Sequence, residues 1–174
     1  SNLVEHIYIG GGIPAADWNG NVETGDASTY TKFTLDNGVV YAKQNIYAGA
    51  WTSADTIVNG GLLEAENDII LGEWDMAGDR TATLTVNGGT VFAKRILKTY
   101  SGKKPVLTLK INGGKFKAKA DTEERVEGED RRIQFFENCG DLEIAGDGLG
   151  FDTDGHDVVA YYWRSEERRV GKEC

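Results

Sequence analysis

A short glycine-containing motif recurs five times along this 174-residue chain. Asn-Gly-Gly occupies 59–61, 87–89 and 112–114, and the segments 36–38 (Asp-Asn-Gly) and 145–147 (Ala-Gly-Asp) fit the same slot. The first residues of successive motifs lie 23, 28, 25 and 33 positions apart. Repeats of that length are typical of solenoids, propellers and other arrays built from one supersecondary unit.

Four positions around each motif are apolar in nearly every copy: one and three residues before its first residue, and four and six after it. These positions hold Leu35, Val58, Val86, Ile111 and Ile144; Phe33, Thr56, Leu84, Leu109 and Leu142; Val40, Leu63, Val91, Phe116 and Leu149; and Ala42, Ala65, Ala93, Ala118 and Phe151. Only Thr56 is polar. A spacing of two is the side-chain alternation of a β-strand. Each motif is therefore predicted to be a turn between two strands, with glycine accommodating positive φ.

A third short strand is predicted in each repeat, as at 46–49 (IYAG) and 69–72 (IILG), with counterparts at 7–10, 95–98 and 133–136. Two architectures fit this pattern. Consecutive hairpins could build a sandwich or barrel, but such an array does not require the same inward position to recur in every repeat. A β-solenoid, whose coils stack at roughly 4.8 Å, does require the same inward position to recur in every repeat. The sequence therefore favours an all-β fold, a single-stranded right-handed parallel β-helix (β-solenoid) of about five coils.

The charge balance excludes several partners. Asp and Glu number 28 against 19 Lys and Arg, which gives a net charge of −9 that repels nucleic acid phosphates and anionic lipid. No apolar run approaches the ~18 residues of a membrane helix, so no membrane insertion is expected. The charge-rich segment Asp121–Arg132 is predicted to be a solvated loop. Glu64, Glu66 and Asp68, spaced by two, are interpreted as the solvated outer face of one strand.

The final segment, 164–174 (RSEERRVGKEC), resembles the translation of a widely used sequencing-adapter strand. We therefore expect 1–163 to be a β-solenoid fragment, truncated at its C-terminal end, and 164–174 to be a non-native tail. Cys139 is the one cysteine of 1–163, so neither an internal disulfide nor a cysteine-based zinc site is expected there.

The repeated motif resembles the β-helical repeat regions of large bacterial surface and secreted proteins, including the passenger regions of autotransporter-like proteins. The resemblance rests on TLTVNGGTV at 83–91 and LTLKINGG at 107–114, together with the strand-turn-strand pattern of 149–159. The glycine-rich, lysine-containing signature that follows such a pattern in that family is absent. The resemblance implies an extracellular or cell-surface setting and a stalk, display or adhesive role. It transfers no catalytic residue.

Two tryptophans supply a candidate binding surface. Trp51 and Trp74 each lie two residues after a glycine, Gly49 and Gly72, and so occupy equivalent places in successive coils. Stacked indole rings could hold sugar rings by face contact. The alternative interpretation is that the two rings cover the edge of a coil or pack against each other.

The densest polar cluster lies at 152–157 (DTDGHD). Asp152, Asp154 and Asp157 around a glycine turn offer the oxygen ligands that calcium prefers, although no EF-hand pattern is present. Asp152 and Asp154 could also meet the roughly 6.5–9.5 Å carboxylate spacing of an inverting glycosidase. An Asp-rich structural turn is the simpler interpretation of the same residues.

These observations favour a non-enzymatic repetitive scaffold or adhesin-like stalk of a secreted or surface-anchored bacterial protein. Its expected partners are the neighbouring coils of the full-length chain and a glycan or host-surface ligand, with calcium as the only candidate cofactor. The alternative is a fragment of a carbohydrate-active β-helix of the polysaccharide lyase or glycosidase type.

Overall fold

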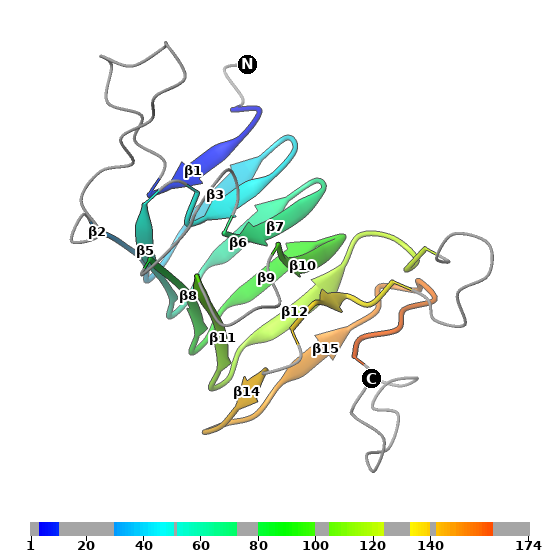
Figure 1. The fold of residues 1–174 in the computed structure, drawn as a ribbon. Helices are drawn as coiled ribbons and strands as arrows, with labels where there is room; N and C mark the ends of the chain where they lie inside the picture. The colour runs from blue at the N-terminus through cyan, green and yellow to red at the C-terminus, as the bar shows by residue number, and fades with distance from the viewer. Residues whose placement is uncertain are drawn as a thin grey trace.

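The structure is a computed structural model that describes residues 4–10, 30–50, 52–72, 80–99, 105–123, 133–139 and 142–161. Within these residues the chain forms fifteen short strands and no helix. The strands form three five-stranded sheets in which every pairing is parallel. Figure 1 shows the sheets as rows of short arrows, stacked from the blue N-terminal strand to the orange C-terminal one.

We name the sheets A, B and C. Sheet A holds β1 (Ile7–Ile9), β4 (Ile46–Ala48), β7 (Asp68–Leu71), β10 (Arg95–Lys98) and β13 (Phe136–Glu137). Sheet B holds β2 (Tyr30–Leu35), β5 (Ser53–Val58), β8 (Thr81–Val86), β11 (Val106–Ile111) and β14 (Glu143–Ile144). Sheet C holds β3 (Val39–Ala42), β6 (Leu62–Ala65), β9 (Thr90–Ala93), β12 (Lys115–Ala118) and β15 (Gly150–Asp152).

Strands that are consecutive in the chain belong to different sheets, and each strand pairs with the strand three places further on. The two strands that flank Asn87-Gly88-Gly89 are a case in point, because β8 lies in sheet B and β9 in sheet C. The motif is therefore a corner between sheets rather than a hairpin turn. The fold is a parallel β-solenoid, and the hairpin array is excluded.

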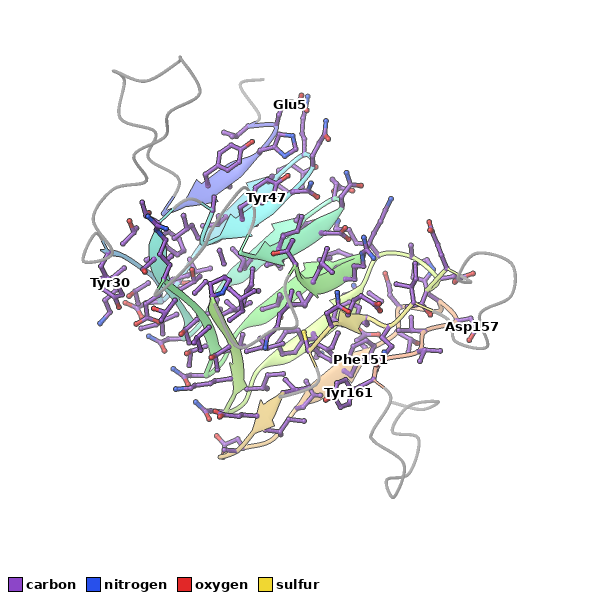
Figure 2. All side chains as sticks on the ribbon, in the orientation of Figure 1. Glu5, Tyr30, Tyr47, Phe151, Asp157 and Tyr161 are labelled. Atoms are coloured by element: carbon purple, nitrogen blue, oxygen red, sulfur yellow. The ribbon has the colours of Figure 1, made fainter. Side chains whose placement is uncertain are left out.

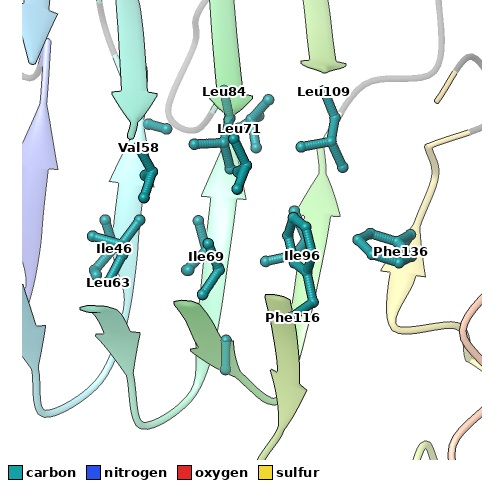
Figure 3. Packing of buried hydrophobic residues seen from close by; sticks show 14 of the residues in the cluster. Ile46, Val58, Leu63, Ile69, Leu71, Leu84, Ile96, Leu109, Phe116 and Phe136 are labelled. Atoms are coloured by element: carbon teal, nitrogen blue, oxygen red, sulfur yellow. The ribbon is translucent and has the colours of Figure 1, made fainter. Parts of the chain in front are cut away.

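The predicted inward columns exist in the predicted register, but the first of them is not buried in the last coil. Leu35, Val58, Val86, Ile111 and Ile144 are successive partners across sheet B, and Ile144 is exposed whereas the other four are buried. Val40, Leu63, Val91 and Phe116 are successive partners across sheet C. Figure 3 shows residues from all three sheets converging on one core, among them Leu63, Ile69 and Leu84, each with no exposed surface. Burial of such a column recurs in successive coils and is the dominant favourable contribution to folding.

The last coil departs from the prediction. Leu149 was expected to follow Phe116, and Phe151 to follow Ala118, but Phe151 is the partner of Phe116. The corner between β14 and β15 spans 145–149, whereas three residues, 112–114, join β11 to β12. The two additional residues shift the register by two, which leaves the inward direction unchanged because the strand period is two. The third strand of the fourth repeat is likewise Phe136–Glu137 rather than 133–136.

The two glycines of a corner have different roles. Gly89 has a φ of 72°, the left-handed region that favours glycine. Gly88 does not, but a Cβ atom there would lie 2.4 Å from the carbonyl oxygen of Asn59 in the neighbouring coil. The first glycine is therefore required by the close approach of two coils, and the second by the backbone conformation.

Candidate functional site

The corner where sheet C passes into sheet A carries two rows of polar side chains along the coil axis. From the strand pairing, one row is Glu5, Gln44, Asn67 and Lys94, and the other is His6, Asn45, Asp68 and Arg95. Side-chain hydrogen bonds join neighbouring coils within the rows: Gln44 Nε2 donates to Glu5 Oε2 over 3.0 Å, and the Asp68 amide donates to Asn45 Oδ1 over 3.0 Å. We call these eight residues the polar corner.

A pocket opens where the polar corner meets the connection between β12 and β13. Its volume is about 290 Å³, and it is lined by Asn45, Asn67, Asp68, Lys94, Arg95, Ala120, Asp121, Thr122, Glu123 and Ile133. Glu5 lies at one end of the polar corner, and Asp157 lies near its other end (Figure 2). We call this cavity the corner pocket.

An ion pair forms part of the lining of the corner pocket. Arg95 Nε is 3.1 Å from Asp68 Oδ2, and both side chains are largely shielded from solvent. Burial raises the pKa of Asp68 above its ordinary value, the Arg95 guanidinium opposes that rise, and the Glu123 carboxylate adds to it. Asp68 was expected on the same outer strand face as Glu64 and Glu66. It lies instead in sheet A, beyond the corner from β6.

The outer wall of the corner pocket is tied to the C-terminal segment. The Thr122 amide donates to the Asp157 carbonyl over 3.0 Å, and the Val159 amide donates to Thr122 Oγ1 over 2.9 Å. Asp121 Oδ1 accepts from the Asp157 amide over 2.9 Å and lies 3.3 Å from His156 Nδ1. Thr122 is buried, which corrects the prediction that this segment is solvated throughout.

The outer face of sheet C carries a second charged group. Lys119 Nζ lies 2.5 Å from Glu64 Oε1 and 2.9 Å from Glu66 Oε1, and it sits 4.0 Å above the centre of the Phe92 ring. The Tyr41 hydroxyl donates to Glu66 Oε1 over 3.0 Å. This Lys119 cluster spans β3 to β12, and its partners satisfy one another, so it acts as a clamp across coils.

The Lys119 cluster shifts the pKa of its members in opposite directions. Burial disfavours the Lys119 ammonium, but the two carboxylates outweigh that cost and raise its pKa above the ordinary value. The hydrogen bond from Lys119 lowers the pKa of Glu66, with burial acting against it. Both groups stay ionised at neutral pH.

The aspartates that were predicted to bind calcium lie in and beside a turn. Asp152 Oδ1 accepts from the Asp154 amide over 2.9 Å, and Asp154 has a φ of 51°. Asp154 Oδ1 also lies 3.6 Å from Lys117 Nζ, and Asp157 contacts the pocket wall through its backbone. Among the described residues, no group of three or more His, Cys, Asp and Glu side chains is arranged to hold a metal ion. Calcium binding at these aspartates stays a prediction.

Trp51 and Trp74, and the tail 164–174, lie outside the described residues. Sheet A shows a different aromatic stack that the sequence reasoning missed. Tyr8 and Tyr47 are partners on β1 and β4, and their rings are stacked with centroids 4.9 Å apart and planes 7° apart. The sequence did contain a signal for this stack. The segments 7–9 (IYI) and 46–48 (IYA) each carry a tyrosine at the same outward position of the repeat.

No protein family, curated protein or solved structure matches the chain. Among the described residues no helix is long and apolar enough to cross a membrane.

Proposed function

We propose that this chain is a non-enzymatic repetitive scaffold, an adhesin-like stalk of a secreted or surface-anchored bacterial protein. Five strands in each sheet support a count of about five coils, and the strong preference of parallel strand crossovers for one hand supports right-handed winding. In this proposal the coils of the full-length chain continue the stack, and the distal part presents a surface to a glycan or host ligand.

The observation that carries the proposal is the continuity of the coil-to-coil contacts. An amide ladder runs along one corner: Asn112 Nδ2 donates to Asn87 Oδ1, Asn87 Nδ2 to Asn59 Oδ1, and Asn59 Nδ2 to Asp36 Oδ1, each over 2.8 Å. The same bond thus joins four successive coils, and the fifth coil, with Ala145 in that slot, lacks it. A regular stack of this kind gives length and stiffness from nearest-neighbour contacts alone, which is what a stalk requires.

The surface setting is tested with antibodies raised against the chain. We expect them to label intact cells of the source bacterium, and external protease to remove the labelling. Antibodies against an internal enzyme of the same cells serve as the control. Labelling that occurs only after permeabilisation would contradict the proposal.

The enzymatic alternative is tested directly. Incubation with pectins, xylans and glucans is expected to release neither reducing ends nor unsaturated products, because Asp152 is used to hold the Asp154 amide and Asp154 lies beside Lys117. Turnover that is abolished by Asp152→Asn but retained by the matched surface variant Asp147→Asn would establish the carbohydrate-active alternative instead.

A further inference from the structure

We propose that the corner pocket binds a single glycosyl unit of an uncharged carbohydrate. The site is separate from the predicted Trp51 and Trp74 surface, and the proposal does not depend on the stalk role. It rests on where the pocket lies, which polar groups it leaves unpaired, and how its wall is held.

The corner pocket lies at the main irregularity of the solenoid. In the earlier coils, sheet C is joined to sheet A by short corners: 43–45, 66–67 and the single residue Lys94. The corresponding connection after β12 spans 119–135. In a regular stack each corner is covered by the next one, so a cavity requires a departure from the repeat. The long connection supplies that departure, and its residues 120–123 and 133 face the polar corner.

The corner pocket contains both hydrogen-bond donors and acceptors that make no bond within the described part of the chain. Among the described residues, the Asn67 side-chain amide, the Lys94 ammonium and the Glu123 carboxylate have no hydrogen-bond partner. Arg95 uses Nε for Asp68, and its two terminal nitrogens make no bond within that part of the chain. A sugar hydroxyl donates and accepts at once, so a mixed set of this kind matches a polyol better than a ligand of one polarity.

Charge and size narrow the ligand further. Asp68 and Arg95 neutralise each other, and Lys94 and Glu123 bring one charge of each sign to the same cavity. Asp121 adds a third carboxylate to the lining, but its Oδ1 already accepts from the Asp157 amide and lies 3.3 Å from His156 Nδ1. An anionic or cationic ligand would therefore meet charges of its own sign as well as opposite ones. A cavity of about 290 Å³ is at the small end of ligand pockets, which suits one ring rather than an extended chain. Ile133 adds apolar surface for the C–H face of the ring.

The wall of the corner pocket is fixed before any ligand arrives. Thr122 is held between the Asp157 carbonyl and the Val159 amide, and the Ile133 amide donates to the Glu123 carbonyl over 2.9 Å. A site whose wall is already ordered does not lose that conformational freedom on binding, so weak contacts suffice for measurable affinity.

The test is NMR titration of the whole chain with methyl glycosides of glucose, galactose, mannose and N-acetylglucosamine, and with glucuronate and glucosamine as charged probes. At least one neutral glycoside should shift the Asn67 and Glu123 resonances saturably, with a Kd of about millimolar. Asn67→Ala and Glu123→Gln should each weaken binding about tenfold. Glu143→Gln, an exposed carboxylate on β14, is the matched control and should bind as the parent does.

Each variant must first show an unfolding midpoint equal to that of the parent. If Asn67→Ala unfolds at a lower midpoint, the milder Asn67→Ser replaces it. Three outcomes would overturn the proposal: no saturable shift with any neutral glycoside, tighter binding of a charged probe, or binding that Glu123→Gln leaves intact and Trp51→Ala with Trp74→Ala removes. None of these outcomes bears on the stalk role.

Discussion

Thr56 is the one polar residue in an otherwise apolar column. Its partners across sheet B are Phe33 and Leu84, and its side chain has no exposed surface. Its Oγ1 has no hydrogen-bond partner in the described part of the chain. A buried hydroxyl without a partner costs roughly 1–3 kcal/mol, so the column tolerates Thr56 rather than needing it.

Replacing Thr56 with valine removes that unpaired hydroxyl while keeping the branched shape. We expect Thr56→Val to raise the free energy of unfolding by about 1–3 kcal/mol in urea titrations. Thr83→Val, at a half-buried outward position of β8, is the control and should change it by less than about 0.5 kcal/mol. A loss of stability in Thr56→Val would mean that its hydroxyl has a partner, or that the site does not face the core.

The Lys119 cluster makes stability depend on pH with a definite sign. Because the folded-state pKa of Glu66 lies below its ordinary value of 4.5, its contribution is fully present above pH 4.5 and is lost as pH falls through the lowered value. Lys119→Met removes the group that lowers this pKa. We expect the variant to be less stable than the parent at neutral pH, and the difference to shrink on acidification.

The measurement is thermal unfolding of parent and Lys119→Met across the acidic range. Lys115→Met, an exposed lysine on β12, is the matched control. Stability curves for parent and Lys119→Met that stay parallel down to low pH would show that Lys119 does not act through Glu66.

At the scale of the element, each coil contains one strand from each of the three sheets, and the corner between sheets B and C holds the coils in register. Asn87 both donates to Asn59 and accepts from Asn112, whereas Asn112 makes only one bond of the ladder. Because strand pairing alone tolerates slippage, a polar ladder at a fixed position selects one register.

The ladder predicts unequal effects of two similar substitutions. Asn87→Ala loses two side-chain hydrogen bonds and should lower the free energy of unfolding by about 1–2 kcal/mol, and Asn112→Ala loses one and should cost about half as much. Denaturant unfolding of both variants provides the comparison. Equal effects, or a larger effect for Asn112→Ala, would mean that the amides do not stabilise the corner as a ladder.

Much of this element could be predicted from the sequence, because period-two apolar positions at a fixed offset from a glycine corner leave little freedom. The columns through Val58 and Val91 were placed correctly. The last corner was not, since Ala145-Gly146-Asp147 shares only its central glycine with Asn-Gly-Gly and the two additional residues lie downstream, where Leu149 and Phe151 are both apolar. The apolar character of Leu149 and Phe151 does not show which of them is the partner of Phe116.

At the scale of the whole molecule, the corner pocket illustrates what a repeat pattern does not reveal. Its polar groups come from three coils and from a connection that interrupts the repeat, so residues as distant in sequence as Asn45 and Ile133 line one cavity. The length of the segment after Ala118 was the available signal. Its charge content led to the interpretation of a solvated loop, because sequence does not show which surface a charged loop covers.

The non-native origin proposed for 164–174 also has a consequence at this scale. A tail that is not part of the fold contributes nothing to folding. Deleting 164–174 should therefore leave the free energy of unfolding within about 0.5 kcal/mol of the parent in urea titrations. A larger loss would mean that the tail packs on the solenoid.

The central claim is that strands adjacent in the chain lie in different sheets and pair only with the strands of neighbouring coils. Scalar couplings across backbone hydrogen bonds, measured by NMR on the isotope-labelled chain, test it most directly. The account predicts a coupling from the Asn87 amide nitrogen to the Val58 carbonyl carbon, and from the Asn112 amide nitrogen to the Val86 carbonyl carbon, bonds of 2.8 Å each. Couplings that instead join β8 to β9 across Asn87-Gly88-Gly89 would establish a hairpin and contradict the solenoid.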